Sequence, residues 1–65
     1  MRILLDEIMN QKKLSNRQVE VMTGISKSTV DNIAKHKRIP RMDTMEKLAA
    51  GLKVRISDLY ESDYK

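Results

Sequence analysis

A short stretch near the middle of the chain collects side chains that can donate and accept hydrogen bonds. The residues at positions that would face outward from a helix over about residues 26–35 are Lys27, Ser28, Thr29, Asn32 and Lys35. An Asn side chain matches the N6 and N7 edge of adenine, Lys can donate to the O6 and N7 acceptors of guanine, and Ser or Thr can serve several bases. This chemistry suits contact with base edges. Asp31 would repel phosphate unless it accepts from a cytosine amino group or pairs with a neighbouring lysine.

Positive charge is concentrated around this stretch. The 65 residues include 13 Lys and Arg against 9 Asp and Glu, which gives a formal net charge of +4. Between residues 26 and 41 the only acidic residue is Asp31, and the basic ones are Lys27, Lys35, Lys37, Arg38 and Arg41. This balance permits a polyanionic partner but does not require one, because a solvated basic face gives the same pattern.

Groups that could support catalysis are scarce. The chain has no cysteine and a single histidine, His36, which lies in the basic segment. Without a second histidine, a thiol, or a carboxylate pair beside a base, we expect no enzyme, no metal site and no cofactor. No small-molecule ligand is evident, and the five methionines are typical of core filling.

The length of the chain predicts one domain over residues 1–65. A domain of this size buries only about 60% of the surface that its unfolded chain exposes, so its margin of stability is narrow. No apolar run reaches the length of a membrane span, and Asp6 and Glu7 interrupt the first apolar residues. We therefore expect a cytoplasmic protein without a membrane partner.

The apolar pattern predicts an all-α fold. Leu5, Ile8 and Met9 have the spacing of an amphipathic helix, which Ile3 and Leu4 extend toward the N-terminus. No run of alternating residues indicates a strand.

Cap residues divide the next segment into two helices. Ser15 and Gln18 have the spacing of a capping box, so a second helix begins there. It runs to about Thr23, because Gly24 can take the positive φ that ends a helix. Small polar residues from Ser26 open a third helix, whose inward face is Val30, Ile33 and Ala34.

Two further helices complete the pattern. Pro40 disfavours helical angles at the residue before it, so a fourth helix begins after it. Asp43 and Glu46 have the spacing of a capping box. Alternatively, they are acidic residues placed in the first turn, where negative charge suits the helix dipole. The apolar stripe of this helix is Met45, Leu48, Ala49 and Leu52, and a short closing helix is expected around residues 57–60. The prediction is a compact five-helix bundle.

Residues 15–35 predict a helix-turn-helix. A helix, a tight turn with glycine and a second helix with a small polar outer face form this motif, whose second helix lies in the DNA major groove. Residues that can pack the two helices together are Val19, Thr23, Ile25, Val30 and Ile33. That packing leaves the polar side chains of residues 26–35 facing outward.

Four runs stand in a characteristic order: Leu14-Ser15, Thr23-Gly24-Ile25-Ser26-Lys27-Ser28-Thr29-Val30, Lys37-Arg38-Ile39-Pro40 and Ser57-Asp58-Leu59. In these runs, and over nearly its whole length, the chain resembles the Cro and phage-repressor family of helix-turn-helix domains, often called XRE-like. The resemblance implies a five-helix, lambda-repressor-like domain that regulates transcription, with a double-stranded DNA operator as partner. It also implies a homodimer on two half-sites about one helical turn apart, and a repressor of phage or mobile-element type.

The resemblance also assigns roles to residues. The base-reading positions of the family fall on Lys27, Ser28 and Asn32, with Lys35 as a further candidate. Exposed amides at the start of the second helix suit phosphate, so Asn16 and Arg17 are candidates. The other residues expected to contact phosphate are Ser26, Thr29, Lys37, Arg38 and Arg41.

Four positions depart from the family pattern. Glu20 stands where the family has a small residue, so either its stem covers the contact while its charge reaches water, or a basic neighbour pairs with it. Lys53 stands where the family has a glycine, and a lysine at positive φ costs about 1 kcal/mol or more, which favours a different turn. Val21 and Met22 stand where the family is usually polar. With Ile3 and Leu4 they either form an exposed apolar patch or are apolar residues scattered singly.

Two other functions are compatible with the pattern. A protein-interaction module, such as an antitoxin-like helical bundle, would keep the fold without the DNA contacts. RNA binding is disfavoured, because only Tyr60 and Tyr64 are aromatic and no stacking platform is evident.

Overall fold

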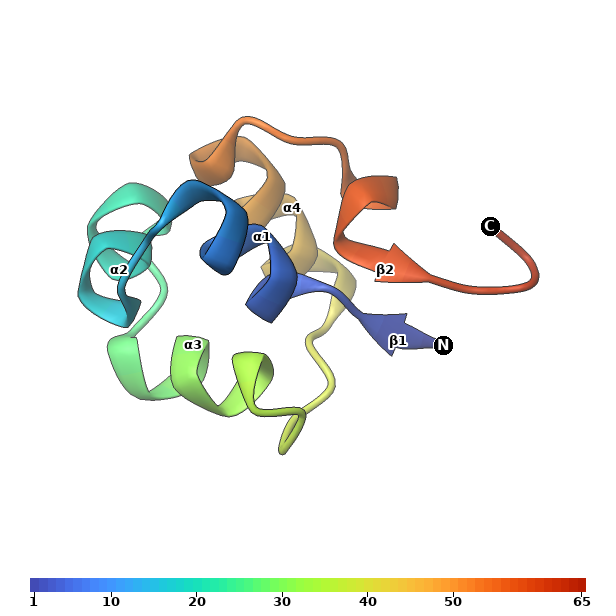
Figure 1. Cartoon of the computed structure of the whole chain (residues 1–65), viewed down its shortest axis with the longest axis horizontal. Coiled ribbons are helices and arrows are strands. Elements are labelled where there is room, and N and C mark those ends of the chain that lie inside the picture. Colours follow the sequence, from blue (N-terminus) through green and yellow to red (C-terminus); the bar gives the residue numbers. More distant parts are fainter.

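The computed structural model describes residues 1–65 and is built mainly of helices (Figure 1). In chain order the elements are β1 (Arg2–Ile3), α1 (Leu5–Lys12), α2 (Asn16–Thr23), α3 (Lys27–Ala34), α4 (Met42–Leu52), the 3-10 helix η1 (Ile56–Leu59) and β2 (Tyr60–Glu61). Helices α2 and α3 pack against each other, and α2 also packs against α4. None of the helices combines the length and the apolar composition that a membrane span requires.

The first predicted helix is present as α1, but the prediction of five helices is wrong, because each end of the chain contains a short strand and the closing segment is not an α-helix. Ile3 does not extend α1, because β1 pairs antiparallel with β2 and places Ile3 opposite Tyr60. The amide of Leu4 then donates to the carbonyl of Leu59 at 2.8 Å. The closing segment is a single 3-10 turn, after which Tyr60 is extended with φ −148°. Figure 1 shows this strand pair bringing the two ends of the chain together.

The predicted caps around the central turn are confirmed. Ser15 Oγ accepts from the amide of Gln18 at 3.2 Å, and Gln18 Oε1 accepts from the amide of Ser15 at 2.8 Å. Gly24 has φ 76° and ends α2. Ser26 is the N-cap of α3, since its Oγ accepts from the amide of Thr29 at 3.4 Å.

Helix α4 begins after Pro40 as predicted, but the expected capping box is wrong. Arg41 is the N-cap residue and its side chain makes no cap hydrogen bond. Asp43 lies in the first turn, where its charge suits the helix dipole, as the alternative prediction had it. The helix ends in a left-handed turn at Lys53, with φ 59° and ψ 44°, so the expectation of a different turn is also wrong.

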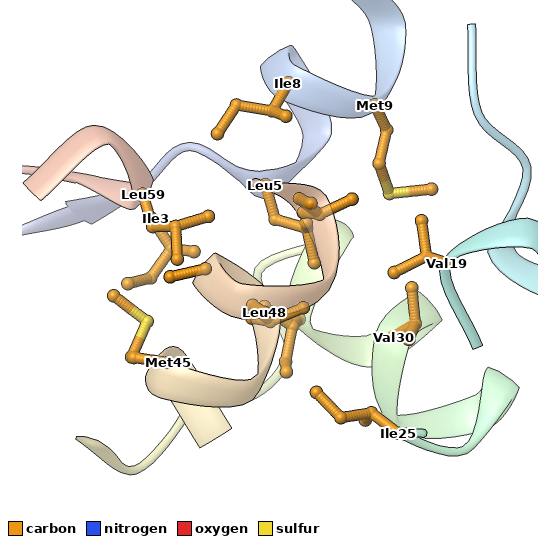
Figure 2. Packing of buried hydrophobic residues seen from close by; sticks show 13 residues of the cluster. Ile3, Leu5, Ile8, Met9, Val19, Ile25, Val30, Met45, Leu48 and Leu59 are labelled. Atoms are coloured by element: carbon orange, nitrogen blue, oxygen red, sulfur yellow. The ribbon is translucent and has the colours of Figure 1, made fainter. Parts of the chain in front are cut away.

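The core is one cluster of apolar side chains (Figure 2). Its buried members are Ile3, Leu5, Ile8, Met9, Val19, Ile25, Val30, Ile33, Met45, Leu48, Ala49, Leu52 and Leu59. Figure 2 shows Val19 of α2 and Val30 of α3 facing each other beside Met9. The inward residues predicted for α4 are all buried, and those for α3 are buried or partly buried against the core, so the core fixes the orientation of α3.

A glycine sets the distance between α2 and α4. A Cβ added at Gly51 would lie 2.5 Å from the carbonyl oxygen of Met22 and 2.6 Å from Thr23 Cγ2. These contacts are too short for any side chain, and one of them is to backbone. The close approach of α2 to α4 therefore requires glycine at position 51.

Candidate nucleic-acid interface

A tight turn joins α2 to α3. The amide of Gly24 donates to the carbonyl of Glu20 at 2.8 Å. Thr23 Oγ1 donates to the carbonyl of Val19 at 2.7 Å and accepts from the amide of Ile25 at 3.2 Å. Because Ile25 is also buried in the core, both the backbone and a side chain hold the turn in place.

Glu20 caps the helix that follows it in the motif. Its Oε2 accepts a hydrogen bond from the amide of Lys27, the first residue of α3, at 3.0 Å. A carboxylate at a helix N-terminus satisfies an otherwise unbonded amide and opposes the positive end of the helix dipole. The partner of Glu20 is thus backbone, whereas the sequence had suggested either water or a basic side chain.

Asp31 links the two helices of the motif. Asn16 Nδ2, at the start of α2, donates to Asp31 Oδ1 at 3.0 Å. Lys35 Nζ, at the end of α3, lies 3.2 Å from Asp31 Oδ2. The sequence predicted that Asp31 either accepts from a cytosine amino group or pairs with a neighbouring lysine. In the chain without DNA, it pairs with a lysine.

The same two contacts stabilise the charged form of Asp31. The hydrogen bond from Lys35 and then that from Asn16 lower the pKa of the Asp31 carboxyl below its ordinary value, while partial burial opposes the shift. The carboxylate is therefore ionised at neutral pH, and its charge offsets part of the positive charge of α3.

The base-reading candidates lie along one helix but differ in exposure. Lys27, Ser28 and Lys35 are exposed, whereas Asn32 is half-buried. Ser28, Asn32 and Lys35 are four and three residues apart, and this spacing places them on one face of α3. Lys27 lies at the first turn of the helix, beside the Glu20 carboxylate.

The phosphate candidates fall into two groups. Asn16, Arg17, Ser26 and Thr29 are at the first turns of α2 and α3, and Ser26 Oγ donates to Thr29 Oγ1 at 2.8 Å. The capping box of α2 leaves the amides of Asn16 and Arg17 without a protein acceptor. The amide donors that the sequence predicted for this end of α2 are thus present.

The second group follows α3, in the connector formed by residues 35–41. Lys37 and Arg38 are exposed and their side chains have no partner within the chain. Arg41 is also exposed, and its Nε lies 3.5 Å from Asp43 Oδ1. The structure therefore joins Asn16 and Lys35 through Asp31, but leaves Lys37 and Arg38 unpaired.

Sequence reasoning missed one long-range contact in this region. His36 Nε2 lies 3.2 Å from Asp6 Oδ2 of α1, so the connector is bonded to the first helix. The two residues are thirty positions apart and each resembles an ordinary surface residue, so no local pattern indicates the contact.

The predicted apolar patch is present only in part. Val21 is 77% exposed and Met22 is 42% exposed, whereas Ile3 is 6% exposed and belongs to the core. Val21 and Met22 line a shallow hollow together with Leu14 and the polar residues Ser15, Arg17 and Gln18. No cluster of three or more His, Asp or Glu side chains could hold a metal ion.

The two helices, the glycine turn between them and the polar face of α3 define a helix-turn-helix protein. A family model described as a Cro/C1-type HTH DNA-binding domain matches residues 4–63. The chain therefore belongs to the family of Cro/C1-type DNA-binding domains. No curated protein matches the chain in sequence.

Proposed function

We propose that this DNA-binding domain, residues 1–65, is a sequence-specific transcriptional regulator whose α3 enters the major groove of double-stranded DNA. The proposal depends on one observation, that contacts on several sides fix the position of α3. Glu20 and Ser26 cap its N-terminus, and Asp31 on its polar face accepts a hydrogen bond from Asn16 of α2. Its apolar face is buried in the core. A recognition helix held in this way has lost much of its freedom before it meets DNA.

Base reading is proposed for Lys27, Ser28, Asn32 and Lys35. Asn32 fits the adenine edge, and the lysines fit the acceptors of guanine. To contact a base, Lys35 must break its ion pair with Asp31. This costs little, because an exposed ion pair contributes only about 0–1 kcal/mol to stability.

Phosphate contact is proposed for two surfaces beside α3. The first is the start of α2 and α3. At α2, free amides and the helix dipole favour an anion beside Asn16 and Arg17, whereas at α3, where Glu20 already caps the helix, Ser26 and Thr29 offer hydroxyl groups. The second is the connector with its exposed cations, Lys37, Arg38 and Arg41. These contacts supply affinity and register, and sequence choice comes from α3.

The proposed regulator acts as a homodimer on two half-sites, each read by one α3. Half-sites for such domains lie about 34–36 Å apart, one turn of the double helix. Bound at an operator in the cytoplasm, it would repress by occluding polymerase, as expected of a regulator of phage or mobile-element type.

The test compares two variants in a gel-shift titration at several salt concentrations. Asn32→Ala should change preference at one base position in each half-site and weaken binding to the preferred duplex by about 1–3 kcal/mol. Arg38→Ala should weaken all duplexes about equally and lower the salt slope by about one unit.

The matched control is Arg55→Ala. Arg55 is exposed and precedes η1, in the segment that Figure 1 draws at the opposite edge of the molecule from α3. Its loss should leave base preference and salt slope unchanged. If Asn32→Ala and Arg38→Ala bind every duplex as the unmodified chain does, the proposal is refuted and the interaction-module alternative is favoured.

A further inference from the structure

The connector after α3 has few attachments to the rest of the chain. The amide of His36 donates to the carbonyl of Ile33 at 3.1 Å, and that of Lys37 to the carbonyl of Asn32 at 2.8 Å. The amides of Arg38, Ile39 and Arg41 donate to no backbone carbonyl. After Lys37, backbone hydrogen bonding therefore does not hold the connector until α4 begins.

His36 provides a side-chain attachment directly before this unattached stretch. Its backbone is in the left-handed region, with φ 61°, and its Nε2 lies 3.2 Å from Asp6 Oδ2 of α1. The other ion pairs of the connector, from Lys35 and Arg41, are to the helices directly before and after it. The His36 contact is thus the only polar side-chain link between the connector and an element distant in sequence.

The two carboxyl oxygens of Asp6 differ in their hydrogen bonding. Oδ1 is fully buried and has no hydrogen-bond partner, so Oδ2 carries all of the side-chain hydrogen bonding of the group. A buried polar oxygen without a partner is rare in native proteins. The left-handed backbone of His36 belongs to the turn that ends α3, in which its amide and that of Lys37 donate back to the helix, so the unpartnered oxygen is the unfavourable feature that accompanies this contact.

We propose that Asp6 and His36 are positioning residues that hold the connector so that Lys37 and Arg38 are placed for phosphate contact. The inference rests on the proposed function, since it concerns the grip on DNA. A connector ordered before binding loses less freedom when its cations meet the phosphates. Asp6 itself is negative, so it can favour DNA binding only through the arrangement that it imposes.

The test uses His36→Gly and Asp6→Ala, with affinity for duplex DNA and resistance to urea measured on each. Glycine adopts φ 61° without strain, so His36→Gly should be as resistant to urea as the unmodified chain or more so, yet bind DNA about three- to tenfold more weakly. Asp6→Ala should weaken binding by a similar factor. The double variant should bind no more weakly than either single variant, because both remove the same contact.

Lys13→Gly is the matched control. Lys13 also has a left-handed backbone, with φ 55°, but its side chain is bonded to no other element. Lys13→Gly and Lys13→Ala remove the same charge and should bind DNA equally, although only the glycine variant relieves the strain, so relief of strain alone does not change DNA affinity.

The sign of the Asp6→Ala effect decides between positioning and simple electrostatics. If removing this negative charge leaves affinity unchanged or raises it while the unmodified chain binds DNA, the inference is overturned. If the unmodified chain binds no duplex at all, the proposed function itself has failed, and the two failures are thereby distinguished.

Discussion

Replacing Glu20 tests whether its carboxylate holds the recognition helix. The relevant contact is the 3.0 Å hydrogen bond from the amide of Lys27 to Glu20 Oε2. Losing a side-chain cap at a helix N-terminus costs about 0.5–2 kcal/mol, and the charge of a carboxylate near that end contributes about 0.3–1 kcal/mol of it. We therefore expect Glu20→Ala to lower the free energy of unfolding by about 1 kcal/mol, and Glu20→Gln by about half as much.

Urea and thermal denaturation at low and high salt provide the assay. A change of about 1 kcal/mol lowers Tm by roughly 4–8 °C in a domain of this size. The difference between Glu20→Gln and the unmodified chain should shrink at high salt, because it is the charge that glutamine removes. Glu46→Ala is the control, since Glu46 is an exposed residue of α4 without a hydrogen bond or ion pair.

A gain in the free energy of unfolding on replacing Glu20 would refute the proposed cap. The resemblance to the family implies a small residue at this position, and a small side chain fits a close contact between helices. If Glu20→Ala is as stable as the unmodified chain or more stable, the carboxylate is tolerated at the contact and does not cap α3.

Three further predictions concern stability. Gly51→Ala should cost about 1–3 kcal/mol by urea denaturation, because its Cβ would meet the backbone carbonyl of Met22 at 2.5 Å and force α2 away from α4. Lys53→Gly should raise the free energy of unfolding by about 1 kcal/mol, because glycine removes the cost of the left-handed φ of 59°. The lowered pKa of Asp31 contributes stability that is present above its unfolded-state pKa and is lost as pH falls through its folded-state pKa. The advantage in stability of the unmodified chain over Asp31→Asn should therefore disappear on acidification below about pH 4.

Each of these has an outcome that contradicts it. A fully stable Gly51→Ala would mean that α2 and α4 can separate without loss of packing. Unchanged stability of Lys53→Gly would show that the lysine gains from another interaction what its backbone loses. A difference between the unmodified chain and Asp31→Asn that is the same at pH 3 and pH 7 would contradict the role given to the Asp31 charge.

The parts of the fold that the sequence predicted are those set by local chemistry. The cap at Ser15 and the turn at Gly24 each depend on residues within a few positions of one another, and both are confirmed. The apolar spacing of α4 is local in the same sense. The strand pair was missed because two residues cannot show an alternating pattern, and the partner of Ile3 is at the other end of the chain.

In the candidate site too, local patterns were predicted and contacts between distant residues were missed. The outward residues of α3 follow from helical spacing, whereas the partners that hold them do not. Glu20 reaches the amide of Lys27 across the turn, and Asp6 reaches His36 from another helix. Such contacts depend on how the helices cross, which is decided by core packing and not by a sequence motif. A family pattern with a small residue at position 20 does not indicate them either.

The most direct test of the central claim, that α3 reads base sequence, is selection of bound duplexes from a random pool by the unmodified chain and by Asn32→Ala. The unmodified chain should recover a palindrome with half-sites about one helical turn apart, and Asn32→Ala should recover the same palindrome with relaxed preference at one position of each half-site. Recovery of no common sequence by the unmodified chain, or of an identical sequence by both proteins, would contradict it.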